Sequence, residues 1–124
     1  MTAGAHSRRA SAALARMPEI DPAIAALALW CRHRDDPGRT RTRGDTILYG
    51  PEFDALSLPE QTGLAAHHVL HVALRHSGRA DALAVRLGAD FDPGRFALAC
   101  DGLINDLLLE GGHALPRPAV RATE

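Results

Sequence analysis

The residues best suited to chemistry lie in one stretch, LAAHHVLHVALRH at residues 64–76, which holds four of the seven histidines of the chain. His67 and His71 are four residues apart. On an α-helix this spacing places two side chains on one face, about 6 Å apart at Cβ, so that two imidazoles can bind one metal ion. Two buried histidines satisfied by hydrogen bonds would show the same spacing. The pair therefore indicates a metal site but is not specific for one.

A hydrolytic zinc site needs a third protein ligand and keeps one position open for water. Asp101 is the leading candidate, because it lies in an apolar run where an ionised carboxylate is costly unless it meets a cation or a metal. A solvated position or an ion pair with arginine would also explain it. Asn105, four residues on, shares its face and could orient Asp101 or bind substrate.

His76 competes with Asp101 as the third ligand. It lies five residues past His71, which is about 140° around a continuing helix. His76 can therefore serve only if the helix breaks before it.

The helix that carries the histidines is predicted to begin at SLPE, residues 57–60, which is a capping box. Ser77-Gly78 is expected to end it. Glu60 lies near the face of His67 but about two turns, roughly 10 Å, away along the helix. Its capping role explains it better than a role as a base.

The other predicted elements surround this helix. Asp21-Pro22 predicts a helix over residues 21–34. Residues 39–49, with the turn pair Gly44-Asp45, predict a short β-hairpin faced by arginines. A short helix is expected over residues 80–87. The last helix is predicted to begin after Asp92-Pro93, to carry Asp101 and Asn105, and to end at Gly111-Gly112.

These elements predict a single α+β domain that is mainly helical, with a short β-hairpin and a metal site between two helices. A length of 124 residues allows one modest core and is too short for two. Residues 1–17 lack a cap and are expected to be a flexible N-terminal segment. Residues 18–112 are expected to form the metal-binding domain, and residues 113–124 an extended C-terminal tail.

Composition narrows the class of protein. The chain is 46% hydrophobic and 23% charged, as is ordinary for a globular protein. Five arginines in residues 30–43 could bind phosphate or carboxylate, but the net charge of -1 argues against a nucleic-acid partner. Cys31 and Cys100 are interpreted as reduced thiols of a cytoplasmic protein. No apolar run approaches about 18 residues, so no membrane span is expected.

Three segments resemble the bacterial putative metallopeptidase domain that usually precedes a VWA-like domain and is itself similar to the HExxH zincins. They are ILYGPEF at 47–53, LPEQTGLAAHHVLHVALRH at 58–76 and ACDGLINDLL at 99–108. The resemblance implies a minimal zincin-like fold in which His67 and His71 bind zinc, with Asp101 as third ligand. It also implies a peptide or protein substrate, and a VWA-like protein and a MoxR-type AAA+ ATPase as partners.

The chain departs from that family at one position. The family's helix reads H-E-x-L-H, and its glutamate is the general base, whereas this chain carries His68 there. A neutral His68 could act as the base, since its ordinary pKa of about 6.5 suits proton transfer at neutral pH. It could instead turn toward the metal and favour another divalent transition metal. The site could also be inactive and retained for structure or binding.

The expected function is therefore that of a zinc-dependent hydrolase of the metallopeptidase type with altered or weakened catalysis. His68 and Asn105 are the catalytic candidates, and Tyr49 could position a carbonyl oxygen. The alternative is an inactive, zincin-like binding module stabilised by its metal. A metal-free helical interaction domain would bind no metal and would lose no stability when His67 or His71 is replaced by alanine.

Overall fold

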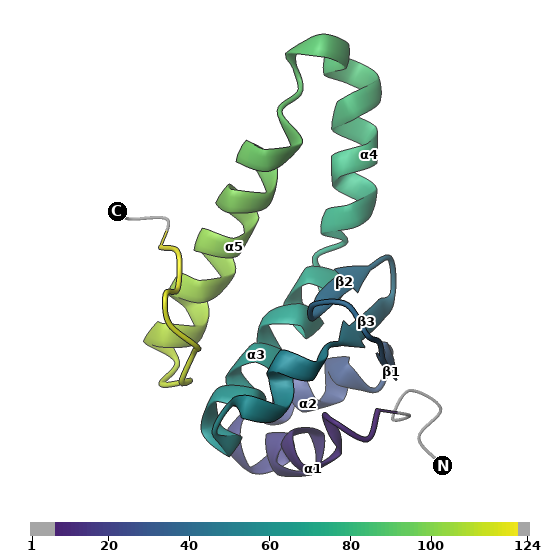
Figure 1. The fold of residues 1–124 in the computed structure, drawn as a ribbon. Coiled ribbons are helices and arrows are strands. Elements are labelled where there is room, and N and C mark those ends of the chain that lie inside the picture. Colours follow the sequence, from purple (N-terminus) through teal and green to yellow (C-terminus); the bar gives the residue numbers. More distant parts are fainter. Residues whose placement is uncertain (1–6, 122–124) are drawn as a thin grey trace.

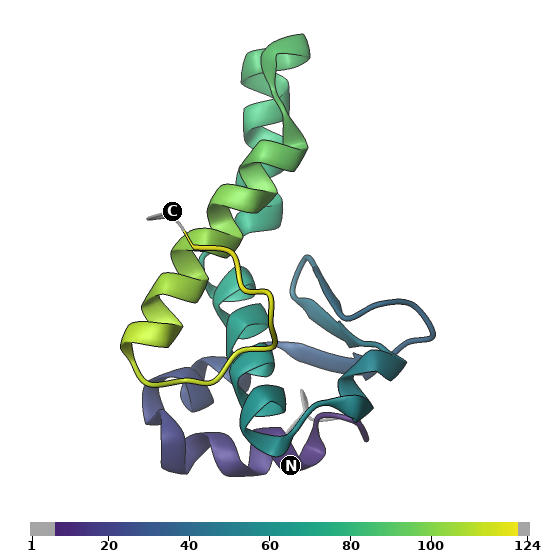
Figure 2. The ribbon, with the colours of Figure 1, turned by 60° about the vertical axis from the view of Figure 1, so that its left-hand side comes forward.

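The computed structural model describes residues 7–121 and has the predicted class, α+β and mainly helical. A long central helix, α3, packs against α1 and α2 on one side, against the small sheet on another and against α5 (Figures 1 and 2). In order, the elements are α1 (Ser11–Ile20), α2 (Pro22–Ala28), β1 (Arg32–Asp35), β2 (Arg41–Arg43), β3 (Thr46–Tyr49), η1 (Pro51–Ala55), α3 (Leu58–Ala73), α4 (His76–Leu87), η2 (Gly88–Asp90) and α5 (Pro93–Glu110).

The packed part of the protein begins earlier than the predicted boundary at residue 18. Residues 11–17 form most of α1, and Ala13 and Met17 are fully buried in the core. Ser7 bonds to the carboxylate of Asp35 and accepts a hydrogen bond from the backbone N–H of Ala10. The segment was expected to be flexible because its helix lacks a cap, but burial of its small apolar face stabilises it. Residues 1–6 lie outside the described part.

The helix predicted over residues 21–34 is too long. Asp21 caps α2 as expected, accepting from the N–H of Ile24 at 3.2 Å, but α2 ends at Ala28. Residues 32–35 instead form β1, which pairs in parallel with β3. The buried His33 explains this change, because its ring lies 2.9 Å from both the Tyr49 hydroxyl and the Ala28 carbonyl oxygen.

The predicted hairpin is confirmed. Strands β2 and β3 are antiparallel, with Arg43 opposite Thr46, and Gly44 has the positive φ of 64° that the turn requires. The strand order is β1-β3-β2, so β2 is an edge of the sheet. This edge contacts α3 and thereby stands beside the histidines.

The capping box of α3 is also confirmed, because Ser57 and Glu60 bond to each other's backbone N–H at 3.2 and 3.3 Å. The end of α3 differs from the prediction. The helix stops at Ala73, Arg75 is left-handed with φ 56°, and α4 already begins at His76. The expected stop signal, Ser77-Gly78, lies inside α4.

Helix α4 and the first half of α5 form a hairpin that projects from the rest of the molecule (Figure 1). No described side chain of α4 is buried. The second half of α5 returns to the core, where Ile104 and Leu108 are buried. Helix α5 has the predicted bounds, from the cap at Asp92 to Gly111.

The segment after α5 has no regular structure, as predicted for the tail, but residues 113–121 are packed rather than loose. His113 is buried and lies 3.1 Å from the Asp21 carboxylate. Leu115 packs against the core. The segment passes so close to α3 that a Cβ at Gly63 would lie 1.6 Å from the carbonyl oxygen of Ala114.

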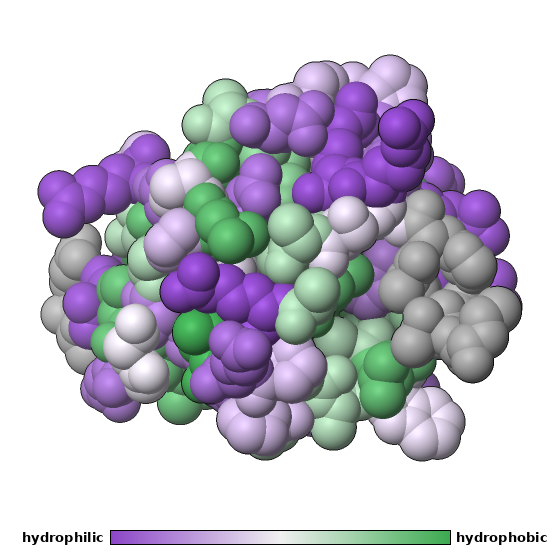
Figure 3. Space-filling model, turned by 90° about the horizontal axis from the view of Figure 1, so that it is seen from below, coloured by the Kyte–Doolittle hydropathy of each residue, from purple (hydrophilic) through white to green (hydrophobic). Residues whose placement is uncertain are grey.

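Seen from the side of α1 and α2, apolar and polar side chains alternate over the surface (Figure 3). Among the described residues, no helix is both long and apolar enough to span a membrane.

Gly63→Ala should destabilise the protein by at least about 2 kcal/mol, because the added methyl group meets backbone that cannot move aside cheaply. Urea unfolding measures the change. Gly78→Ala is the matched control: it also lies within a helix, has open space around its Cβ position and should stabilise by about 0.5–1 kcal/mol. Equal effects of the two changes would contradict the close approach of residues 63 and 114.

The buried His33 should make the fold sensitive to acid. Burial lowers the pKa of His33, although the hydrogen bond to Ala28 opposes the change. The unfolded chain takes up this proton below about pH 6.5, whereas the folded protein does so only at lower pH. The free energy of unfolding should therefore fall as the pH drops below about 6.5. Urea titrations across this range should show a shallower fall for His33→Gln, and equal slopes would contradict the assignment.

Candidate metal centre

Three predicted ligands converge at one point between α3 and α5. The Nε2 atoms of His67 and His71 lie 3.1 Å apart, and Asp101 Oδ1 lies 3.2 Å from the first and 2.8 Å from the second. The two histidines come from successive turns of α3, and Asp101 comes from the middle of α5. Within residues 7–121 they form the one group of three side chains whose metal-binding atoms are close enough to share an ion, and we call these three side chains the donor group.

The geometry and the chemistry of this group fit a divalent metal. Ligand atoms at about 2.1 Å from a tetrahedral zinc ion lie about 3.4 Å apart, so the three observed distances need to widen by about 0.2–0.6 Å. Burial raises the pKa of Asp101, but its close contacts with the His67 and His71 rings outweigh this effect and hold the pKa well below its usual range. Two imidazole nitrogens and an ionised carboxylate are ligands that zinc and several other transition metals accept.

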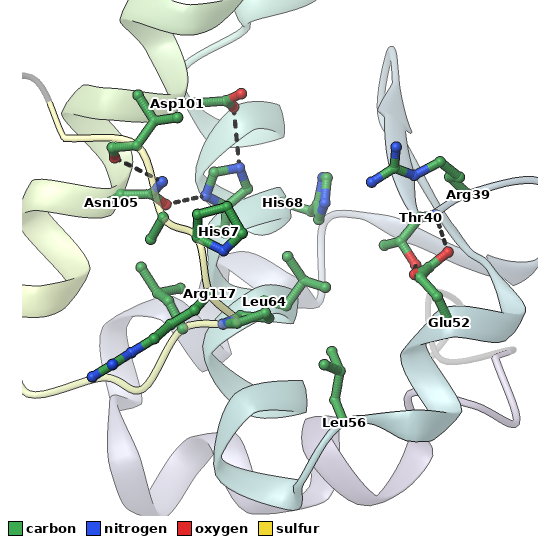
Figure 4. A pocket seen from close by; sticks show the side chains of 15 residues that line it. Arg39, Thr40, Glu52, Leu56, Leu64, His67, His68, Asp101, Asn105 and Arg117 are labelled. Carbon is green, nitrogen blue, oxygen red and sulfur yellow. Dashed lines mark hydrogen bonds and ion pairs between the residues drawn. The ribbon is translucent and has the colours of Figure 1, made fainter.

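Asn105 orients His67 rather than Asp101 (Figure 4). Its Nδ2 donates to the carbonyl oxygen of Val120 at 3.0 Å, so its Oδ1 faces His67 Nδ1 at 2.7 Å. Because Oδ1 can only accept, His67 Nδ1 carries the hydrogen, and the lone pair of the neutral ring is at Nε2, among the other donor atoms. Both polar atoms of Asn105 are engaged in these two contacts, and its role in binding substrate stays a prediction.

His76 comes close to the centre on the opposite side of His71. Its Nδ1 lies 2.9 Å from His71 Nδ1, whereas the donor group is formed by Nε2 of the same ring. The helix does break before His76, but the break brings His76 to the back of His71 and not into the group of three side chains that could hold a metal.

His68 lies beside the donor group without joining it. Its Nδ1 is 2.7 Å from the hydroxyl oxygen of Thr42 on β2, and its Nε2 makes no hydrogen bond to any described residue. Burial lowers the pKa of His68 well below its usual value, and the neighbouring His67 and His71 add to this effect while Asp101 opposes it. His68 is therefore neutral at physiological pH.

Two cavities flank the donor group. The larger, about 400 Å³, lies between α3, η1 and residues 115–120, with Arg39 extending toward it from the loop before β2 (Figure 4). The smaller, about 290 Å³, lies between β2, the start of α4 and the apolar side chains of Pro93 and Phe96. His68 and Asp101 line both cavities.

Two residues considered from the sequence lie elsewhere. Tyr49 is fully buried in the core, where burial raises the pKa of its hydroxyl and His33 binds it. Glu60 caps α3. Conversely, no sequence pattern indicates Thr42 or Val120, because Thr42 reaches the site through the strand order and Val120 through the path of the C-terminal segment.

Comparison with curated proteins and with solved structures gives no match. Residues 5–124 match the family described as "Putative metallopeptidase domain". This match spans nearly the whole chain, including all the residues of the candidate metal centre, and agrees with the resemblance found in the sequence. The chain thus belongs to the putative metallopeptidase domain family.

Proposed function

We propose that the protein is a metal-dependent hydrolase of the metallopeptidase type, with His67, His71 and Asp101 holding zinc or another divalent transition metal. The observation that carries this proposal is the convergence of three donor atoms within 3.2 Å beside two cavities. A metal bound there would supply Lewis acidity for hydrolysis. The open faces toward the cavities leave room for water and substrate.

In this proposal His68 takes over the proton-accepting role of the family's glutamate. It is neutral, so one ring nitrogen offers a lone pair. If Nδ1–H donates to the Thr42 hydroxyl oxygen, that lone pair is at Nε2, which no described residue engages. Thr42 then selects the tautomer in which His68 can accept a proton from water.

A peptide or protein is the proposed substrate, by the family resemblance and because two separate cavities each reach His68 and Asp101. A VWA-like protein and a MoxR-type AAA+ ATPase remain proposed partners from the family resemblance. The cytoplasm remains the proposed compartment. In its support, Cys31 and Cys100 are free and buried. Burial, aided by the charge of Asp45, raises the pKa of Cys31 to about 11, which keeps the thiol unreactive.

A second candidate is an inactive binding module in which the metal is structural. Two observations favour it: His68 replaces the family's glutamate, and the donor group joins α3 to the middle of α5. The α4–α5 hairpin projects from the molecule, so a metal at this joint would fix its position on α3.

Metal content tests both candidates. Protein purified without a histidine tag or chelator should contain about one metal ion per chain by elemental mass spectrometry. His67→Ala, His71→Ala and Asp101→Ala should each lose it. His113→Gln removes a buried histidine outside the donor group and should retain it. Folded wild-type protein that binds no zinc, cobalt, copper, nickel or iron would refute the metal centre.

Substitution at His68 separates the enzyme from the binding module. His68→Gln removes the proton acceptor and should slow peptide cleavage by about 10²–10⁴-fold, whereas His68→Glu restores a carboxylate and should retain or raise the rate. Cleavage of a mixed peptide library is followed by mass spectrometry on metal-loaded proteins. Equal rates for wild type and His68→Gln would exclude His68 as the base. Absence of cleavage by both wild type and His68→Glu would favour the binding module.

A further inference from the structure

The turn between α3 and α4 has an unusual backbone for its sequence. Arg75 adopts φ 56° and ψ 42°, a left-handed conformation that non-glycine residues rarely adopt. On a continuous helix, His76 would lie about 140° around the axis from His71. The break instead places the two rings edge to face, with centroids 5.1 Å apart and Nδ1 atoms 2.9 Å apart.

The contact between these rings is made by the nitrogen of His71 that faces away from the donor group. When Nε2 of a neutral imidazole binds a metal, the hydrogen is on Nδ1, and a partner that accepts this hydrogen fixes the ring. His76 Nδ1 is the partner in reach of His71 Nδ1. Asn105 Oδ1 holds the same position against His67 Nδ1 at 2.7 Å.

We infer that His76 is a positioning residue that holds His71 in its metal-binding orientation by accepting a hydrogen bond from His71 Nδ1. This inference rests on the proposed metal centre and extends it. Each of the two proposed ligand histidines then has its own hydrogen-bond acceptor at Nδ1. These acceptors come from different helices, Asn105 from α5 and His76 from α4. The left-handed backbone of Arg75 places His76 beside His71 Nδ1.

The surroundings of His76 agree with this role. The ring of Phe96, on α5, lies nearly perpendicular to the His76 ring, with centroids 6.3 Å apart and an interplanar angle of 83°. Its Nδ1 faces the back of His71, and His76 is not among the three described side chains that could share a metal. His76 therefore acts on the metal through His71.

Cobalt(II) binding to the full chain tests the inference. A titration measures the affinity, and the visible spectrum of the bound cobalt reports its coordination, so neither measurement depends on hydrolysis. His76→Ala should weaken cobalt(II) affinity by about 10- to 100-fold. His76→Asn should restore most of the affinity, since its Oδ1 can occupy the position of the histidine Nδ1. Ser77→Ala, in the same turn, should bind as the wild type does. The visible spectrum of the bound cobalt should keep its shape in all variants.

Each result has a distinct meaning. Unchanged affinity in His76→Ala, or equal loss in His76→Ala and His76→Asn, would overturn the positioning role. A changed spectrum would overturn it by showing that His76 is itself a ligand. Folded wild-type protein that binds no cobalt(II), zinc or other metal would refute the proposed metal centre and this inference with it. Absence of peptide cleavage would leave the cobalt result intact and bear on catalysis alone.

Discussion

Three atoms that can each offer an electron pair lie next to one another between α3 and α5, and this contact requires a proton or a cation between them. His67 Nε2, His71 Nε2 and Asp101 Oδ1 lie within 3.2 Å of one another. In this arrangement a proton or a cation must separate them, because like partial charges at such distances repel. The carboxylate stays ionised, so a cation bound by this group would tie the two helices together.

Helix α3 has to serve two environments at once. One side carries Ala65, Ala66 and Val69 into the core, and another carries the histidines toward the cavities. Small residues on the first side let α1 approach closely, and this approach stabilises a segment whose own helix has no cap. Core packing on the far side of the same helix thus holds His67 and His71 in place.

The sequence predicts the parts of the site that depend on local rules. Four-residue spacing, the capping box and the Asp92-Pro93 start place His67, His71, Asp101 and Asn105 on two helices. It fails where tertiary contacts override local preference. The local pattern predicts helix for the segment after Ala28, but burial of His33 beside Tyr49 favours a strand. The break before His76 was placed too late, since an arginine takes the left-handed position that usually marks glycine.

The hydrogen bond between Asn105 and Val120 links the candidate metal centre to the C-terminal segment, which contributes no candidate ligand. Asn105 can be rotated by 180° about its amide with little change in shape, and only its partners distinguish oxygen from nitrogen. The Val120 carbonyl makes that distinction. A segment without regular structure thereby decides which nitrogen of His67 is free for a metal. Displacement of residues 115–121 would therefore remove the constraint that fixes the Asn105 amide, and with it the preference of His67 for one ring nitrogen as the hydrogen carrier.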